Sequence, residues 1–279
     1  MATCSGFAEL KADDELLLEA LREGGFAAEP AVWDEDGVEW DRFDLCLVRS
    51  TWDYEDKHRE FLEWARRVER KTTLWNPAET IAWNSDKRYL RELARRGVPT
   101  VPTACVEPGS GIDLEEVLAR RGWAEAVVKP AVDLGARNLR RVRAGGADDA
   151  LEAVLRRGEA MVQPFLPSLE EEGELSLVFI AGELTHAVRK RPAAGDFRGQ
   201  STWGGTARRE EPARRERELA ARALADLRPA PLYARVDLVR DLAGDPVLIE
   251  LELIEPNLYL RENPAAADAL AAAAAARLR

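Results

Sequence analysis

A segment near the C-terminus carries charged side chains whose spacing could hold a metal ion. The segment reads YARVDLVRDLAGDPVLIELEL, with two runs rich in Val, Leu and Ile around the turn signal DLAGD. Two short apolar runs joined by such a turn predict a β-hairpin. Its charged residues of interest are Arg235, Asp237, Glu250 and Glu252.

The register expected for this hairpin brings these four groups together. We expect Arg240 to pair with Val247 across the turn, which places Asp237 opposite Glu250. Arg235 then lies opposite Glu252. All four side chains point to one side of the hairpin, because side chains alternate between the two faces along a strand. The opposite face would carry the apolar residues that a core needs, namely Val236, Leu238, Ile249 and Leu251.

Opposed carboxylates on an otherwise apolar hairpin need a counter-charge. They repel each other across the strands, and burying them unpaired costs several kcal/mol. A hard divalent cation with oxygen ligands removes this cost, and Mg²⁺ that bridges substrate phosphates is a common occupant of such sites. The alternative is an exposed polar face on a two-sided sheet. We would favour that alternative for one acidic pair, but three acids in register with Arg235 favour the metal site.

Composition limits the remaining possibilities. The chain has 279 residues, 46% hydrophobic and 33% charged, which is typical of a globular protein. We find no apolar run of roughly 20 residues and no signal peptide, so we expect a cytoplasmic protein without a membrane association. The net charge of -11 argues against nucleic-acid binding. With two histidines and three scattered cysteines, acids and lysines must carry the chemistry.

The periodicity of the chain predicts alternating helices and short strands, an α/β pattern. Only MATC precedes the first loop, so the first strand is either very short or begins upstream of this start. The Gly- and Arg-rich segment 191–208 predicts a mobile loop that faces substrate. Expected helices are 13–24, 58–70, 84–96, 114–121, 147–157, 212–227 and 264–279. Expected strands are 44–49, 124–129, 138–143, 175–180 and 183–190, besides the hairpin.

Several motifs upstream of the hairpin suggest a nucleotide site when taken in order. Lys129 ends an apolar strand before a glycine-containing turn, where an ammonium group can meet phosphate oxygens. Lys87 is a weaker candidate, since a solvated lysine on a helix is the simpler interpretation. The strand exit 163–166 (QPFL) precedes an acidic loop and Glu174. Two lysines, a strand exit, an acid and a distal acidic hairpin together indicate an ATP site.

In this order of motifs, residues 81–263 resemble the ATP-grasp superfamily, in which a nucleotide lies between two α+β lobes. The resemblance implies two Mg²⁺ ions on the hairpin acids, with Mn²⁺ as an alternative, and Arg235 at the transferred phosphoryl group. Many relatives have asparagine in place of Glu252, and the loop after Lys129 has only Gly135. Residues implied to bind ATP are Lys87, Lys129, Gln163, Phe165, Leu166, Glu174 and Arg189; those implied to bind metal are Asp237, Glu250 and Glu252.

Four further segments resemble a bacterial, glutathione-synthetase-like branch that includes cycloserine synthetase: RSTWDY, WNSDK, VRKRPAAGDFRGQ and LELIEPNLYL. This implies a Rossmann-like pre-ATP-grasp substrate domain over 1–80 and an ATP-grasp domain over 81–279, with a lid at about 100–165. The catalytic residues implied are Arg235, Arg198 and Lys190, and the substrate residues are Arg49, Asp53 and Asn257. A surface ion pair is the alternative role for each arginine.

The resemblance implies an ATP- and Mg²⁺-dependent carboxylate–amine ligase that acts through an acyl phosphate on a small amino-acid-like substrate. A small-molecule kinase on the same scaffold and a non-catalytic ATP-binding regulator are the alternatives. The identity of both substrates, and whether the amine belongs to the same molecule as the carboxylate, stay open. A homodimer is a further expectation, with no protein partner implied otherwise.

Overall fold

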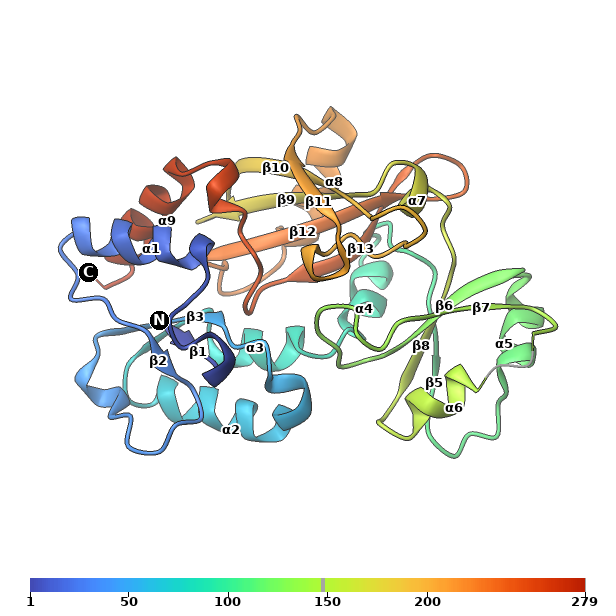
Figure 1. Ribbon diagram of the computed structural model, residues 1–279, viewed down its shortest axis with the longest axis horizontal. Coiled ribbons are helices and arrows are strands. Elements are labelled where there is room, and N and C mark those ends of the chain that lie inside the picture. Colours follow the sequence, from blue (N-terminus) through green and yellow to red (C-terminus); the bar gives the residue numbers. More distant parts are fainter. Residues whose placement is uncertain (147–148, 279) are drawn as a thin grey trace.

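The computed structural model of the chain describes residues 1–146 and 149–278. Three β-sheets lie along an elongated molecule, with helices on their faces (Figure 1). The mixture of parallel and antiparallel sheets confirms the predicted α/β character. In the described part of the chain, none of the helices has both the length and the apolar character needed to cross a membrane.

The N-terminal lobe is a parallel sheet covered by helices. Its strand order is β2-β1-β3-β4, and β1 has two residues. Four aromatic rings, of Trp33, Trp40, Phe61 and Trp64, pack edge-on or stacked in its core. The strands are β1 (Ala2–Thr3), β2 (Ala31–Val32), β3 (Leu45–Ser50) and β4 (Thr73–Trp75), and the helices are α1 (Ala12–Glu23), α2 (His58–Glu69) and α3 (Ala78–Asn84).

The central sheet is antiparallel, in the order β11-β10-β9-β12-β13. Helix α8 packs against its β12–β13 side, and α9 lies against β9. Its strands are β9 (Glu174–Ile180), β10 (Glu183–Arg191), β11 (Thr206–Arg209), β12 (Tyr233–Arg240) and β13 (Pro246–Glu252). The helices are α7 (Ser168–Glu171), α8 (Arg214–Leu224) and α9 (Ala265–Ala276). Residue 279 of the helix expected at 264–279 is outside the described residues.

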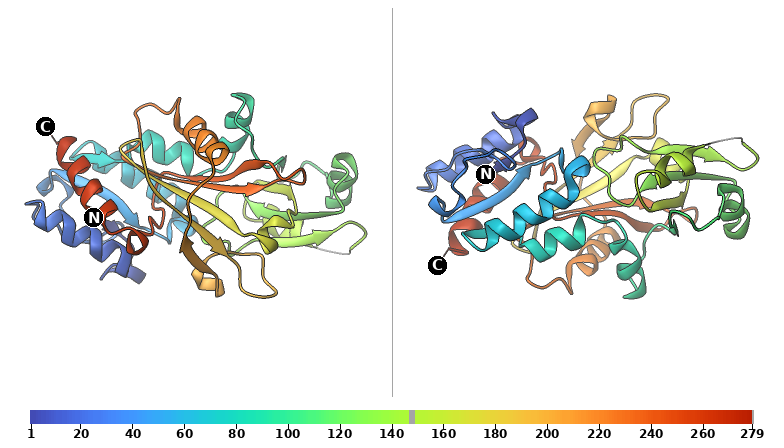
Figure 2. Two further views of the ribbon diagram at one scale, coloured as in Figure 1. Left: turned by 90° about the horizontal axis from the view of Figure 1, so that it is seen from above. Right: turned by 90° about the horizontal axis from the view of Figure 1, so that it is seen from below.

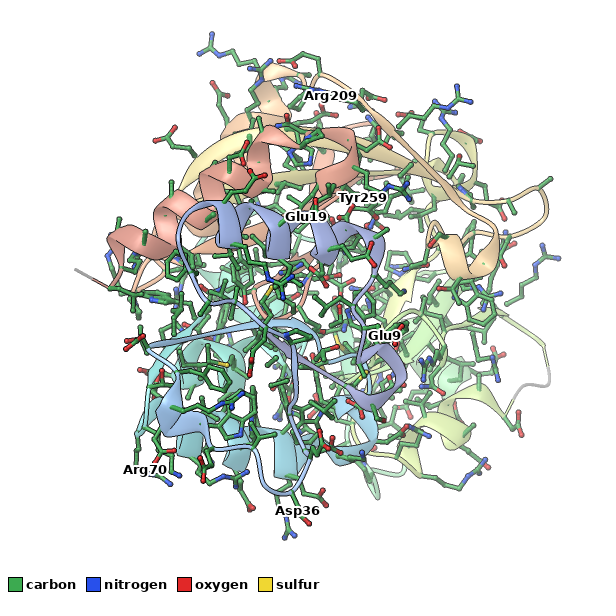
Figure 3. All side chains as sticks on the ribbon, turned by 60° about the vertical axis from the view of Figure 1, so that its left-hand side comes forward. Glu9, Glu19, Asp36, Arg70, Arg209 and Tyr259 are labelled. Carbon is green, nitrogen blue, oxygen red and sulfur yellow. The ribbon has the colours of Figure 1, made fainter. Side chains whose placement is uncertain are left out.

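The two ends of the chain meet. Figure 3 shows α1, which carries Glu19, beside α9, and the two helices share an apolar cluster that includes Leu17 and Leu270. Asp13 does not cap α1 as a start signal would. Its carboxylate instead accepts the backbone N–H groups of Leu260 and Arg261, at 2.8 and 3.0 Å. The C-terminal segment therefore fixes the N-terminal lobe against the central sheet.

A third lobe projects from the far end of the molecule, and Figure 2 shows it apart from the other two. It is an antiparallel sheet in the order β5-β8-β6-β7, with two helices on it. Its elements are β5 (Ala104–Val106), α5 (Leu114–Arg121), β6 (Glu125–Pro130), β7 (Arg140–Arg143), α6 (Ala150–Leu155) and β8 (Ala160–Pro164). Positions 147 and 148 of the helix expected at 147–157 lie outside the described residues. This lobe corresponds to the segment that we propose as a lid.

The hairpin forms with one change of register. Asp237 pairs with Glu250, and Arg235 pairs with Glu252, as expected. Arg240, however, pairs with Pro246 and not with Val247, because a bulge in β13 adds one residue before Glu250. The bulge also moves Ile249 from the expected core face to the wall of a cavity, and Leu248 takes the core position.

The segment 84–96, expected to form one helix, spans the end of one helix, a break and a second helix. Helix α3 ends at Asn84 and α4 spans Tyr89–Arg95, so Lys87 lies in the break and not on a helix. The backbone N–H of Lys87 donates to the carbonyl of Ala131 at 2.8 Å. The Asn84 side chain bonds backbone groups of Leu251 and Leu253. These tertiary hydrogen bonds replace the helical ones.

Candidate active site

A cavity of about 530 Å³ lies where the three lobes meet. The N-terminal lobe contributes Trp52, the lid lobe contributes Lys129, and the central sheet contributes Glu250. Eleven of the residues predicted from the sequence line it: Lys87, Lys129, Gln163, Leu166, Glu174, Lys190, Arg198, Arg235, Glu250, Glu252 and Asn257. The fold therefore gathers residues that are up to 170 positions apart, from 87 to 257, around one space.

The three hairpin acids form one cluster. One carboxylate oxygen from each of Asp237, Glu250 and Glu252 lies within 4.8 Å of the others. Asp237 is fully buried at the floor of the site, while the two glutamates are half-buried at the cavity wall. The cross-strand pairing of β12 with β13 produces this arrangement, because Asp237 and Glu250 are direct partners.

Three cations neutralise this cluster. The ammonium group of Lys87 lies 2.9 Å from Glu250 Oε1. The guanidinium group of Arg235 lies 2.8 Å from Asp237 Oδ2 and also contacts Glu252. Lys190 lies 3.1 Å from Asp237 Oδ2 and contacts Glu174 on the neighbouring strand. The ion pairs hold each acid in a fixed position.

The pKa values of the acids diverge. Burial alone would raise the pKa of Asp237, but the charges of Arg235 and Lys190 outweigh it and hold the pKa well below its usual range. Burial raises the pKa of Glu252 to about 7 in spite of Arg235. Burial likewise raises the pKa of Glu174 to about 8, with Lys190 opposing. Burial therefore separates the pKa values of acids that lie within one cluster.

This donor set fits a hard divalent cation. Carboxylate oxygens are the ligands that Mg²⁺ prefers, and three of them come together here from two paired strands. A bound cation would add positive charge beside Glu250 and Glu252 at the cavity wall.

The lid side of the cavity offers groups for a nucleotide. Lys129 is buried at the end of β6, and Lys87 donates to the carbonyl of Asp133 at 2.5 Å. The Gln163 amide donates to the Thr103 hydroxyl at 2.9 Å. Leu166 lines the cavity beside them. Phe165 lies behind this wall, with the Arg141 guanidinium carbon 3.5 Å from its ring centroid.

The loop after β10 covers another side of the cavity. Arg198 lines the cavity, donates to Asp196 at 2.7 Å, and lies 3.5 Å from the ring centroid of Trp203. The Trp203 indole donates to the carbonyl of Gly135 at 3.0 Å, in the loop after β6. The two loops thus touch across the mouth of the cavity.

Three residues proposed from the sequence point elsewhere. Arg189 faces the other side of β10 from Lys190, where it pairs with Glu210 at 2.6 Å. Arg49 is buried inside the N-terminal lobe, 2.9 Å from Asp14, and donates to the carbonyl of Pro256.

Asp53 accepts the Trp33 indole N–H at 2.8 Å, within the N-terminal lobe. The strand register turns Arg189 away from the cavity, and ion pairs and hydrogen bonds hold Arg49 and Asp53. The ATP role of Arg189 and the substrate roles of Arg49 and Asp53 stay predictions.

Sequence reasoning missed other residues at the cavity wall. Lys11, Trp52, Tyr54, Glu255 and Tyr259 line the cavity. Burial raises the pKa of Glu255 well above its usual range, and the charge of Glu252 adds to the effect. A signal was available, because Trp52 and Glu255 fall within RSTWDY and LELIEPNLYL. Trp52 and Glu255 both lie outside helices and strands, so sequence periodicity does not predict which way their side chains point.

A hairpin of acids under a cavity, facing a separate antiparallel lobe, defines the ATP-grasp ligases, and the chain belongs to this family. Residues 108–256 match the family described as prokaryotic glutathione synthetase, ATP-grasp domain. Residues 1–76 match the family described as D-cycloserine synthetase DcsG, N-terminal domain. The chain is accordingly an ATP-dependent ligase, as the sequence predicted, and its family uses ATP with Mg²⁺.

Individual relatives cover most of the chain. It is 35% identical over 289 residues to the cycloserine biosynthesis protein DcsG of Streptomyces lavendulae, covering 94% of this chain and 93% of the relative. The crystal structure of D-cycloserine synthetase DcsG matches with a TM-score of 0.89 and 33% identity, covering 100% and 98%.

Two further matches are more distant in sequence. The chain is 31% identical to the glutathione synthetase of Prochlorococcus marinus, covering 64% of this chain and 56% of the relative. The D-alanine–D-alanine ligase from Bacillus anthracis complexed with ATP shares the fold, with a TM-score of 0.69 at 17% identity, covering 99% and 95%.

Proposed function

We propose that the chain joins a carboxylate to an amine on small, amino-acid-like substrates, with ATP as the energy source. The observation that carries the proposal is the cluster of Asp237, Glu250 and Glu252 with Arg235 and Lys190 at one cavity that the N-terminal lobe also reaches. Such a cluster can hold the metal ions and neutralise the charges that phosphoryl transfer requires. A second reactant would bind on the side of the cavity that the N-terminal lobe lines. Several relatives are named as synthetases or ligases, which agrees with this class.

In the proposed reaction, a carboxylate oxygen attacks the γ-phosphorus of ATP and the bond to the β-phosphate oxygen breaks, which gives an acyl phosphate and ADP. The amine nitrogen then attacks the acyl carbon, loses a proton, and phosphate leaves with its C–O bond broken. Lys87, Lys129 and Arg235 lower the barrier by neutralising charge on the phosphoryl oxygens. Arg198 would stabilise the oxyanion from the covering loop. No covalent nucleophile on the protein is required.

The finer assignments rest on position in the cavity. Asp237, Glu250 and Glu252 would hold Mg²⁺, which supplies charge neutralisation between phosphates; we propose two ions, with Mn²⁺ as an alternative. Residues 163–166 would contact adenine, through backbone groups in the case of Phe165. Glu174 would meet the ribose, although its carboxylate pairs with Lys190 in this structure. Asn257 would contact substrate.

Whether the amine belongs to a second molecule is a separate question. The similarity to a D-cycloserine synthetase along the whole chain favours a ring closure within one molecule. Similarity to glutathione synthetases and α-L-glutamate ligases favours joining two molecules, but these matches cover smaller shares of the chain, 64% and 63% in two cases. We therefore propose cyclisation of an amino-acid derivative as the first possibility to test.

The test is a screen of amino acids and their derivatives for ADP release in the presence of Mg²⁺. With its substrates, the ligase releases ADP and inorganic phosphate in equal amounts, and hydroxylamine traps the acyl phosphate as a hydroxamate. A kinase instead leaves phosphate on an alcohol and yields no hydroxamate. A regulator binds ATP without turnover. AMP with pyrophosphate, or a stable phosphoester, contradicts the proposal.

A further inference from the structure

In the described structure, the segment 253–259 follows β13 outside any helix or strand, and side chains from other elements hold it. Four of its consecutive carbonyl groups, those of residues 255–258, each accept a hydrogen bond from a different side chain. In the order of the acceptors, the donors are Trp52 at 3.0 Å, Arg49 at 2.7 Å, Arg235 at 3.2 Å and His186 at 3.0 Å. The segment brings Asn257 and Tyr259 to the cavity wall (Tyr259 is labelled in Figure 3).

The hydrogen bond from His186 has a direction that its acceptor determines. A carbonyl oxygen only accepts, so the ring nitrogen Nε2, 3.0 Å from the Leu258 oxygen, must carry the proton. The other ring nitrogen, Nδ1, lies 2.9 Å from the Thr185 hydroxyl oxygen. Burial lowers the pKa of His186, which favours the neutral ring. The imidazole is therefore a fixed donor with its proton on Nε2.

The Leu258 carbonyl belongs to the peptide group that enters Tyr259. Side chains bond both polar atoms of this peptide group, because Asn257 Oδ1 accepts the Tyr259 N–H at 2.9 Å. The Tyr259 backbone is left-handed, with φ 49° and ψ 43°, a conformation that a bulky residue keeps only where surrounding contacts impose it. Rotation of the peptide group would release that conformation. The two hydrogen bonds therefore determine where the Tyr259 ring lies.

The position of this ring matters to the acid cluster. Its centroid lies 5.9 Å from the guanidinium carbon of Arg235, which pairs with the hairpin acids. His186 itself is 5% exposed, and within the described chain the residues that line the cavity do not include it. On β10 it shares a face with Lys190, four residues further on. One strand therefore supports both the acid cluster and the segment beside it.

We propose that His186 is a positioning residue of the proposed reaction. Its bond to the Leu258 carbonyl fixes the peptide group that enters Tyr259, and the Tyr259 ring and the Asn257 side chain then stay at the cavity wall. The inference rests on the proposed function, in which Asn257 contacts substrate, and it adds a requirement for a residue outside the cavity. ATP affinity should not depend on this residue, because the proposed adenine contacts lie at 163–166.

The first test uses NMR on the unaltered protein and needs no substrate. The chain contains two histidines, His58 and His186, so isotopically labelled histidine gives two sets of ring signals, and His58→Gln shows which set belongs to His186. We expect a proton bonded directly to Nε2 of His186. A neutral ring with its proton on Nδ1 overturns the proposal, because Nε2 then has no hydrogen to donate.

The second test compares hydrogen exchange in residues 257–263 among variants without substrate. His186→Leu removes the donor, whereas His186→Gln retains an amide N–H. Ser168→Ala is the matched control, because it removes another side-chain bond to a backbone carbonyl, that of Arg240 at 2.6 Å. We expect exchange to be about fivefold faster or more in His186→Leu and nearly unchanged in the other two. Equal exchange in His186→Leu and Ser168→Ala contradicts the proposal.

The third test measures turnover with the amino acid or derivative that releases most ADP in the screen described above. His186→Leu should lower kcat by about tenfold or more, because displaced side chains misalign the reactants, and should leave the KM for ATP within about twofold. His186→Gln should recover most of the lost kcat, and Ser168→Ala should lose none. Recovery by glutamine separates a hydrogen-bond donor from a side chain that only fills space. Unchanged kcat in His186→Leu, or no recovery by glutamine, overturns the proposal.

Failure of this inference and failure of the ligase proposal give different results. If the unaltered protein releases no ADP with any compound, the ligase proposal fails, and the NMR and exchange tests still decide whether His186 fixes the segment. If the unaltered protein turns over and His186→Leu does so with the same kcat, the ligase proposal stands and this inference fails. Circular dichroism melting checks that each variant is folded.

Discussion

Lys190 on β10 and Asp237 on β12 form an ion pair, with 3.1 Å between Nζ and Oδ2, although strand β9 lies between them. The residue of β9 opposite Asp237 is Ser176, whose small side chain donates to Asp237 Oδ1 at 2.6 Å. A larger residue there would separate the lysine from the acid. The site therefore depends on three strands and not on the hairpin alone.

Lys190 should be needed for stability as well as for chemistry. Its side chain is 3% exposed, and Lys190→Met would leave Asp237 and Glu174 without this cation. Breaking a buried ion pair by removing one partner costs about 3–5 kcal/mol, and we expect the lower end because Arg235 still pairs with Asp237. Urea unfolding without ligands measures the loss. Arg191→Met, at the exposed neighbour, should change the free energy of unfolding by less than about 0.5 kcal/mol. Equal effects of the two substitutions would contradict the prediction.

Glu250 should separate catalysis from nucleotide binding. Glu250→Gln keeps the shape of the side chain but removes the charge of a proposed metal ligand, so we expect turnover to disappear while ATP affinity stays within about tenfold. We expect adenine, ribose and lysine contacts to supply much of that affinity. ADP release measures turnover, and calorimetry measures binding. Asp245→Asn, in the exposed turn of the same hairpin, is the control. Near-normal ADP release by Glu250→Gln would contradict the proposal that Glu250 binds a catalytic metal ion.

Lys129 should matter to ATP in a way that an exposed lysine does not. It is 5% exposed at the cavity, whereas Lys71 is exposed on the N-terminal lobe. Because charge-assisted bonds to phosphate are strong, Lys129→Ala should weaken ATP binding by roughly tenfold or more, and Lys71→Ala should not. Calorimetry with ATP and Mg²⁺ compares them. If both changes are small and equal, Lys129 is a strand-end lysine without a nucleotide contact.

Glu55 should hold the loop after β6 against the N-terminal lobe. Its side chain is 3% exposed, accepts the Leu134 backbone N–H at 2.7 Å, and lies 3.4 Å from Arg137. A hydrogen bond to a charged group contributes about 1.5–3 kcal/mol, so Glu55→Ala should speed hydrogen exchange in residues 131–139 by about tenfold or more. Mass spectrometry reads this out.

The neighbouring residue gives a matched control for Glu55. Asp56 is 63% exposed and pairs with Arg157 on the lid lobe at 3.0 Å. An exposed ion pair contributes little, so Asp56→Ala should leave exchange in 131–139 nearly unchanged. Unchanged exchange in Glu55→Ala would mean that the loop is held by other contacts, such as that between Trp203 and Gly135.

Local patterns were sufficient for the central chemistry. Alternation of polar and apolar residues around a turn predicted that Asp237 faces Glu250, and the structure confirms that pairing. The order of lysines and acids along the chain predicted the family, which the comparisons confirm. The hairpin can be read from the sequence because successive side chains of a strand point to opposite faces, so polar and apolar residues alternate.

Other features depended on contacts between distant segments. Periodicity continues from 84 to 96, yet hydrogen bonds from Asn84 to Leu251 and from Lys87 to Ala131 divide the helix. Arg189 and Lys190 are adjacent cations with similar local signals, and only the pairing of β10 with β9 decides which one enters the cavity.

The remaining site residues carry no regular pattern at all. Glu255 and Lys11 are 244 positions apart in loops, and they reach one cavity end because the C-terminal segment packs on the N-terminal lobe. The sequence by itself determined the hairpin, its acids and the family, since these follow from local alternation and motif order. Tertiary structure decided which cations face the site and which residues line its far end, since these follow from packing between segments that local sequence does not encode.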